Sequence, residues 1–315
     1  IEKCSTKYID GVFTRIYRYL LREDIYHAAY QNLYANKGAT TKGIDEDTAD
    51  GFSNEYVQEL INSLKDGSYK AKPVRREYIP KQNGKLRPLG IPTFRDKLLQ
   101  EVVRMILEAI YEPIFHKNSH GFRPGKSCHT ALKQIKTEFT GVVWFIEGDI
   151  KGCFDNINHN KLIEILGRKI KDSKFLNIIR QFLKAGYIEN WQYNATYSGA
   201  PQGSICAPIL ANIYLNELDK KFDEISTHFD KPSSAYKSPK YHEVDKEMKR
   251  LSYWIDNTTD EEERQELIKR YKEQKKSLRT LPCKNKDNKR FTFVRYADDW
   301  LVGVCGTKED CKDLK

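Results

Sequence analysis

Three aspartates stand where carboxylates need a counter-charge. Asp298 and Asp299 are adjacent at a turn between two apolar segments, and Asp149 ends a third apolar segment. Neighbouring carboxylates repel one another, and Mg²⁺ is a cation that prefers such hard oxygen ligands. Two of these ions, about 3.5–4 Å apart, can activate a 3′-hydroxyl and neutralise a leaving pyrophosphate. An Asp-Asp pair alone also suits an ordinary polar turn, so the surrounding segments must decide.

Strands are expected to position these acids. Residues 142–149 form a short apolar run, which predicts a buried strand with Asp149 at its carboxyl end. Residues 291–296 and 300–304 predict two further strands, which flank a tight turn at 297–299. The three carboxylates would then all lie at strand ends.

A basic hairpin is predicted nearer the N-terminus. Residues 76–80 and 86–91 alternate as strands do, and an Asn-Gly pair between them signals a type I′ turn. A guanidinium makes bidentate contacts to phosphate, and an ammonium supplies a compact charge. Lys81 and Arg87 on this hairpin can therefore clamp a triphosphate.

Two helical regions have clear sequence patterns. From Asp96 onward, apolar residues at helical spacing and charges on the other face predict an amphipathic helix. Between about 223 and 290 the composition changes to mostly charged residues, which favours a solvent-exposed helical insertion rather than a separate domain.

The overall composition favours a polyanionic partner. The 315 residues are 39% hydrophobic and carry a net charge of +10, and nucleic acid is the commonest polyanion in cells. No apolar run reaches the length of about 20 residues that a membrane helix needs, so no membrane partner is expected. The seven cysteines form no Cys-x-x-Cys pair, which favours free thiols in a reducing cytoplasm. We expect a bacterial cell.

Five short segments follow one another in a recognisable order. They are Arg87-Pro88-Leu89-Gly90-Ile91-Pro92, His120-Gly121-Phe122-Arg123-Pro124-Gly125, Asp149-Ile150-Lys151-Gly152-Cys153-Phe154-Asp155, Pro201-Gln202-Gly203-Ser204 and Tyr296-Ala297-Asp298-Asp299. Together they resemble the group II intron-encoded reverse transcriptases, also called maturases. Each segment is weak evidence alone, but five in sequence are specific, and the resemblance covers about residues 36–304.

The resemblance implies a centre that holds two Mg²⁺ ions. Asp149 and Asp298 would bridge the metals, with the carbonyl of Ile150 as a further ligand and Asp299 contributing less directly. Phe154 would lie under the sugar of the incoming nucleotide and exclude a 2′-hydroxyl, so that the product is DNA. The alternative for Phe154 is an ordinary core aromatic.

Further contacts to substrates follow from the same resemblance. Lys81 and Arg87 would bind the triphosphate, Gln202 the nucleotide sugar, and Ile91 the templating base. Arg75 is assigned to the template backbone, although a merely solvated arginine remains an alternative at this position.

The implied fold is α+β, a right-hand polymerase with fingers, a palm built on an antiparallel sheet, and no thumb. Residues 1–95 and 156–200 would form the fingers, and residues 96–155 and 201–315 the palm with its charged insertion. Because the chain also lacks an initiator Met, we expect it to be a fragment.

The implied activity is RNA-directed DNA synthesis for a group II intron. Its partners would be an RNA template, a DNA primer, deoxynucleoside triphosphates and the intron RNA; a homodimer is left open. The alternative is an RNA-binding splicing cofactor whose polymerase activity is secondary or lost. Retained acids, which repel RNA, favour the polymerase. Reverse transcriptases of retrons and diversity-generating elements share these acids and form a third possibility.

Overall fold

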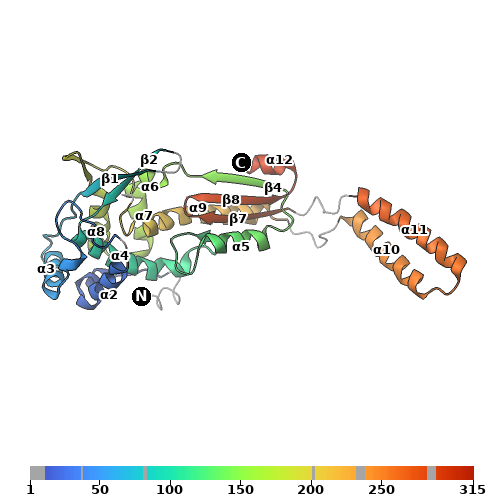
Figure 1. Ribbon diagram of the computed structural model, residues 1–315, viewed down its shortest axis with the longest axis horizontal. Coiled ribbons are helices and arrows are strands. Elements are labelled where there is room, and N and C mark those ends of the chain that lie inside the picture. The colour runs from blue at the N-terminus through green and yellow to red at the C-terminus, as the bar shows by residue number, and fades with distance from the viewer. Residues whose placement is uncertain (1–10, 37, 81–83, 201–202, 232–237, 282–288) are drawn as a thin grey trace. The chain divides into compact units, whose positions relative to one another are not determined.

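The computed structural model describes residues 11–36, 38–80, 84–200, 203–231, 238–281 and 289–315 (Figure 1). Two units can be distinguished, each assembled from several stretches of chain. The first contains Ile1–Leu132, Asp149–Lys220 and Arg295–Trp300, and the second contains Lys133–Gly148, Lys221–Val294 and Leu301–Lys315. Within the described ranges no helix has the length and apolar character needed to cross a membrane.

The first unit consists of helices around a hydrophobic core, together with a small sheet. Its helices are η1 (Ile16–Leu21), α2 (Glu23–Tyr34), η2 (Ala49–Gly51), α3 (Asn54–Lys65), α4 (Phe94–Tyr111), η3 (Glu112–Ile114), α6 (Cys153–Asn156), α7 (His159–Lys169) and α8 (Ser173–Lys184). The helices α5 (Cys128–Glu138) and α9 (Ala207–Phe229) begin in this unit. Apolar side chains from most of these helices are buried in a common core.

The predicted amphipathic helix is confirmed as α4, and part of its charged face is buried as well. Asp96 and Lys97 are only 3% and 6% exposed. The Asp96 carboxylate accepts a hydrogen bond from the Tyr69 hydroxyl at 2.5 Å, and the Lys97 ammonium donates to the carbonyl of Thr41 at 2.6 Å. These polar groups tolerate burial because the loops packed on α4 supply their partners.

A four-stranded sheet in the first unit has the order β2-β1-β5-β6. Its strands are β1 (Val74–Pro80), β2 (Leu86–Ile91), β5 (Tyr187–Glu189) and β6 (Gln192–Asn194). β1 and β2 form the predicted antiparallel hairpin, and β5 adds to β1 in parallel with Val74 opposite Tyr187. Because side chains alternate along a strand, Val74, Arg76 and Tyr187 share one face of this sheet.

The second sheet has the order β3-β7-β8-β4. Its strands are β3 (Ser119–His120), β4 (Trp144–Asp149), β7 (Arg290–Tyr296) and β8 (Asp299–Cys305). Two residues link β7 to β8, so these strands form the predicted hairpin. β3 pairs with β7 in parallel, so the expected antiparallel sheet is mixed at this edge. β4 alternates between half-buried and exposed positions instead of being fully buried, because successive side chains point to opposite faces of the sheet and one face of β4 is exposed.

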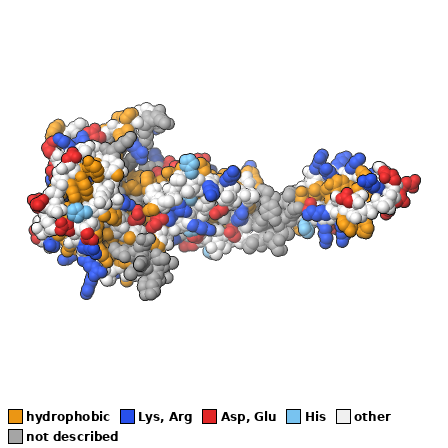
Figure 2. Space-filling view, turned by 60° about the horizontal axis from the view of Figure 1, so that its bottom comes forward, with side chains coloured by type: hydrophobic (Ala, Val, Ile, Leu, Met, Phe, Trp, Pro, Cys, Tyr) orange, Lys and Arg blue, Asp and Glu red, His pale blue; other side chains and the backbone are white. Residues whose placement is uncertain are grey.

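The second unit contains a pair of charged helices. α10 (Pro239–Asn257) and α11 (Glu261–Thr280) pack side by side within the region expected to form an insertion (Figure 1). The acidic first turn of α11 lies at the joined end of the pair, and basic side chains are spread over the visible face (Figure 2). Elsewhere in this unit Phe222 of α9 packs against Phe293 of β7, and α12 (Lys308–Asp313) follows β8.

A buried ion pair holds the turn between β7 and β8. The Nε and Nη2 atoms of Arg295 donate to the two carboxylate oxygens of Asp219 at 2.7 and 2.6 Å, and both side chains are fully buried. Nη1 donates to the carbonyl of Ala297 in the turn, and Nη2 to the Ser119 hydroxyl, each at 2.7 Å. The bidentate geometry and these further partners offset the desolvation of both charges. One guanidinium therefore joins α9, β3 and the turn.

Replacing Asp219 by Ala is expected to destabilise the protein by about 3–5 kcal/mol, because the Arg295 guanidinium would stay buried without its counter-charge. Chemical denaturation followed by circular dichroism measures this loss. The matched control is Glu217→Ala on the same helix, α9. It removes partly exposed ion pairs with Arg168 of α7 and with Lys220, and should cost less than about 1 kcal/mol. Equal, small effects of the two substitutions would contradict the assigned role of Arg295.

Candidate functional site

The turn between β7 and β8 has an unusual backbone shape that β3 supports. Ala297 has a φ of 55°, in the left-handed region, and its N–H donates to the carbonyl of His120 at 3.0 Å. A Cβ added to Gly121 would lie 3.0 Å from the Ala297 nitrogen. Because a side chain at Gly121 would displace the turn, the segment at 120–125 serves here as a support for the turn that carries Asp298.

β4 brings Asp149 to the same turn. The N–H of Val143 donates to the carbonyl of Val304 at 3.1 Å, and β4 is the neighbour of β8 in the sheet. β8 ends one residue after Val304, so β4 must run back along it in the antiparallel direction. Moving six residues in opposite directions from Val143 and Val304 leads to Asp149 and Asp298, which therefore lie across from each other.

The thiol of Cys153 lies within the electric field of these acids. Burial and the Asp298 carboxylate raise the pKa of Cys153 to about 11, Asp149 acts in the same direction, and Arg295 opposes it. Carboxylates act on one thiol in this way only when they share its surroundings. Asp298 is half-buried and Asp149 is exposed, so this concentrated negative charge is open to a cation.

The donor set at the turn is small. In the described parts of the chain, no three side chains of the His, Cys, Asp and Glu types are grouped closely enough to hold a metal by themselves. A cation here would rest on the carboxylates of Asp149 and Asp298 together with backbone and substrate oxygens. That mixture of few carboxylates and other oxygens is the pattern that Mg²⁺ favours beside phosphates.

Phe154 is fixed on the short helix α6. Its half-buried ring meets the ring of Phe122 edge to face, with 6.3 Å between centroids. Its carbonyl accepts a hydrogen bond from the Ala200 N–H at 2.7 Å, and a Cβ added to Gly199 would fall 2.7 Å from the same carbonyl oxygen. The loop that leads to the Pro201-Gln202 segment is therefore clamped onto the helix that carries Phe154.

The predicted residues of the β1–β2 hairpin lie apart from the acids in sequence and have different surroundings. Arg87 is exposed on β2, whereas Ile91 is half-buried and lines an apolar cavity of about 210 Å³. Arg75 donates through Nε and Nη2 to the carbonyl of Lys42, at 3.2 and 2.9 Å. In this structure the side chain of Arg75 thus braces an N-terminal loop.

Two predicted residues, Lys81 and Gln202, lie outside the described residues. The glycine that follows Gln202 is informative nevertheless. Gly203 has a φ of 104°, and a Cβ added to it would lie 2.6 Å from the carbonyl oxygen of Gly90. The segment that begins at Gly203 therefore meets β2 next to the strand position of Ile91.

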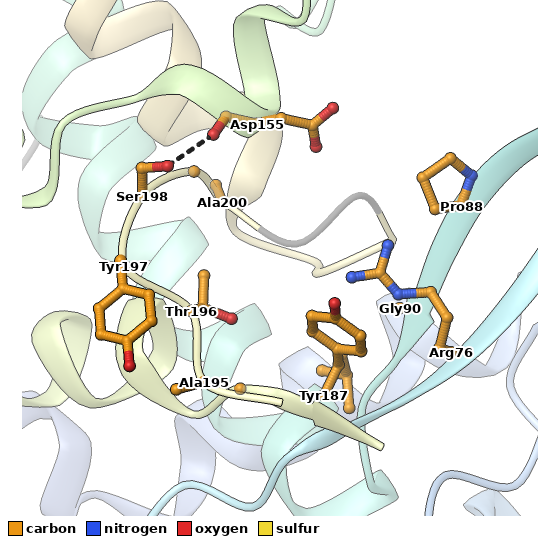
Figure 3. Close-up of a pocket in the computed structure, with 13 residues that line it drawn as sticks. Arg76, Pro88, Gly90, Asp155, Tyr187, Ala195, Thr196, Tyr197, Ser198 and Ala200 are labelled. Atoms are coloured by element: carbon orange, nitrogen blue, oxygen red, sulfur yellow. Dashed lines mark hydrogen bonds between the residues drawn. The ribbon is translucent and has the colours of Figure 1, made fainter. Parts of the chain in front are cut away.

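A cavity of about 250 Å³ lies beside α6 (Figure 3). Arg76 reaches into it from β1, and its guanidinium carbon is 3.9 Å from the centroid of the Tyr187 ring on β5. Asp155 of α6, residues 195–200, and Pro88 and Gly90 of β2 also line it. In Figure 3 the side chains of Arg76, Tyr187 and Thr196 face the same space.

Sequence reasoning gave no role to Arg295 or to Arg76. For Arg295 a signal was available, because an arginine within an apolar strand must find a partner if it is buried. For Arg76 the signal was absent, because it is one of many basic residues in the hairpin and its aromatic neighbour lies 111 residues away in the chain.

Residues 79–248 match the family described as reverse transcriptase (RNA-dependent DNA polymerase). The chain is 58% identical over its whole length to the group II intron-encoded protein LtrA of Lactococcus lactis subsp. cremoris, and covers 53% of that protein. It is 42% identical over its whole length to an uncharacterized 91 kDa protein in the cob intron of Schizosaccharomyces pombe, of which it covers 38%. It is also 32% identical, over 96% of its length, to protein YkfC of Escherichia coli (strain K12), of which it covers 73%.

The chain spans about half the length of LtrA. The family match includes more than half of this chain, and it contains the segments at 87–92, 120–125, 149–155 and 201–204 that carry the resemblance. The turn with Asp298 follows it in the chain, on the strand pair whose geometry is described above. The chain therefore belongs to the reverse transcriptase (RNA-dependent DNA polymerase) family.

Proposed function

We propose that this chain carries the nucleotidyl-transfer centre of an RNA-directed DNA polymerase encoded by a group II intron. The observation that carries the proposal is the position of Asp149 across from Asp298, at a turn held by a buried guanidinium. Pairing of the strands does not require two carboxylates at this turn. Metal-assisted phosphoryl transfer does require them, because the carboxylates hold the ions. Membership of the family supports the same reaction.

We assign the metal ligands to the acids at the turn. Asp149, Asp298 and the carbonyl of Ile150 would hold two Mg²⁺ ions, and Asp299, which is exposed at the start of β8, would contribute less directly. When bound, the ions would lower the pKa of the attacking 3′-hydroxyl and neutralise the leaving pyrophosphate. The protein supplies a turn that is already rigid, so little reorganisation is needed during the reaction.

The nucleotide contacts follow from the elements that meet near α6. Phe154 is held by Phe122 and by the loop at 199–200, so its ring is a stiff barrier that can exclude a 2′-hydroxyl. Arg87 and Lys81 would bind the triphosphate, and Gln202 the sugar. The described segments next to Arg87 and after Gln202 approach each other, since a Cβ on Gly203 would lie 2.6 Å from the carbonyl oxygen of Gly90.

The template is expected to follow the hairpin. Ile91 would pack under the templating base, and Arg75 would bind the template backbone after releasing the carbonyl of Lys42. In this assignment residues 1–95 and 156–200 form fingers, and residues 96–155 and 201–315 form a palm. The net charge of +10 supports binding of an RNA template and a DNA primer.

A second role in RNA splicing is supported by the relatives. LtrA is described as group II intron-encoded, and another relative is a protein of the cob intron. We propose that the same basic protein binds its intron RNA to assist splicing and mobility. Binding of this kind needs phosphate contacts but does not need the acids at the turn.

Changing either metal ligand should separate these two roles. Asp149→Asn and Asp298→Asn are each expected to lower DNA synthesis by at least about 10²–10³-fold, because the charge that holds the ions is reduced. Primer extension on an RNA template by the full-length protein, with Mg²⁺ and with EDTA, measures this effect. RNA affinity should stay within about threefold, since phosphate contacts are untouched.

The control for this experiment is Asp256→Asn, an equal charge change on α10 that should leave synthesis intact. Full-length protein that folds, binds intron RNA and promotes splicing, but makes no DNA before any substitution, would instead favour the splicing cofactor without polymerase activity. Unchanged synthesis in Asp298→Asn would refute the assigned metal site.

The choice between deoxyribonucleotides and ribonucleotides should depend on Phe154. Phe154→Val is expected to improve incorporation of ribonucleotides relative to deoxyribonucleotides by about 10–200-fold, because a smaller side chain leaves room for the 2′-hydroxyl. Single-nucleotide incorporation kinetics give this ratio. Phe145→Val, which removes an exposed aromatic from β4, should leave the ratio unchanged. An unaltered ratio in an active Phe154→Val protein would mean that Phe154 is only a packing residue.

A further inference from the structure

The cavity beside α6 has no part in the proposed reaction, because none of the residues that line it is assigned to metal, nucleotide or template (Figure 3). One wall is the sheet face that carries Val74, Arg76 and Tyr187, and the residues at 195–200 and Asp155 form others. Its volume of about 250 Å³ is below the range of about 300–1,000 Å³ that drug-sized ligands occupy. The cavity therefore suits a single ring system rather than a complete nucleoside triphosphate.

Arg76 provides hydrogen-bond donors at this cavity. Its Nε atom is buried and has no hydrogen-bond partner in the described parts of the chain. The ring of Tyr187 covers one side of the guanidinium at 3.9 Å. The guanidinium as a whole presents five N–H donors in a planar fork, so a ligand that offers acceptors beside it in the cavity can pair with them. Unpaired nucleobases stack on guanidinium planes as well as on aromatic rings.

The charges of the lining select among ligands. In the described lining, Arg76 is the one cation and Asp155 the one anion. A phosphate would be attracted by the first and repelled by the second. A neutral ring with acceptors on one edge and N–H donors on the next satisfies both residues without a net charge.

Guanine has this arrangement of groups. Its O6 and N7 atoms accept from an arginine in the bidentate manner used for guanine recognition in nucleic acids. Its N1–H and 2-amino groups are adjacent donors that match the two oxygens of a carboxylate. We propose that this cavity binds a guanine base, with Arg76 on the O6/N7 edge and Asp155 on the N1/N2 edge. The base is either that of a free nucleoside or an unstacked base of a single strand.

Binding of guanosine to the protein in EDTA tests the proposal directly. Guanosine has no phosphate and needs no metal, so the outcome is independent of whether the chain is a polymerase. Isothermal titration should give guanosine an affinity at least about tenfold above that of uridine, which lacks the adjacent donors. Equal affinity for guanosine, adenosine, cytidine and uridine, or no binding of guanosine, would overturn the proposal.

Substitutions at the two charged residues identify the contacts. Arg76→Met keeps an apolar side chain over Tyr187 but removes the donors, and should weaken guanosine binding by about 10–100-fold. Arg180→Met makes the same charge change on the exposed face of α8 and should have no effect. Guanosine affinity that is unchanged in a folded Arg76→Met protein would exclude the assigned contact.

Asp155→Asn gives a change of ligand preference that a purely structural role of Asp155 would not produce. The carboxamide can donate to the C2 oxygen of xanthosine, where guanosine has an amino group, so the preference should move from guanosine to xanthosine. Because Asp155 is exposed, this variant is expected to fold even if Arg76→Met does not. A preference that stays with guanosine would refute the role of Asp155.

The source of the base is decided with short RNA strands. The pentamers UUGUU and UUUUU differ in one base, and a cavity that takes an unstacked base should favour the first by several-fold in wild type and not in Arg76→Met. A free nucleoside ligand is indicated when guanosine binds but the two pentamers bind equally.

Discussion

The guanidinium of Arg295 is the interaction on which the arrangement of the acids depends. It is fully buried, and its donors reach α9 through Asp219, β3 through Ser119 and the turn through Ala297. A buried ion pair of this kind adds little net stability compared with apolar residues of equal volume, because desolvation offsets the attraction. Its effect is geometric, since three elements that are far apart in sequence can satisfy one planar group in only one relative position.

Close backbone contacts also hold the segments around the acids in place. Gly121 approaches the turn, Gly199 approaches the carbonyl of Phe154, and Gly203 approaches Gly90, each with a positive φ. Only a residue without Cβ allows such approaches without strain. The segments that resemble family boxes are therefore, in large part, places where loops touch one another. Their glycines allow the loops to approach one another closely, which fixes the positions of the neighbouring side chains.

Local features could be predicted from the sequence, and features that depend on distant partners could not. The hairpin around Asp298 could be predicted because apolar alternation and a tight turn are local signals in the sequence. The burial of Lys97 was missed because its partner is the carbonyl of Thr41, 56 residues earlier. The exposure of one face of β4 was missed because a run of apolar residues does not reveal whether both faces of a strand are covered.

The positions of the two acids on their strands were predictable to a similar limit, while their role as metal ligands stays a prediction. Asp149 and Asp298 were chosen because acids at the ends of apolar strands are costly without a cation, and the sheet places them across from each other. Arg295 could not be paired with Asp219 from spacing alone, since 76 residues separate them. The cavity at Arg76 could not be predicted from the sequence either, because it forms where β1, β5 and the loop at 195–200 meet.

The helix α6 carries one residue of each of the two proposed binding sites in the first unit. Phe154 and Asp155 are adjacent on this four-residue helix, and the Ser198 hydroxyl donates to the carbonyl of Asp155 at 3.0 Å. A ligand that engages the Asp155 carboxylate would restrain the same helix that positions the Phe154 ring. A ligand in the cavity and a nucleotide at Phe154 can favour the same position of α6. Each then raises the affinity for the other by the same factor, because coupling between two binding sites is reciprocal. The shortness of α6 makes this coupling direct, since no second turn of helix can absorb the displacement.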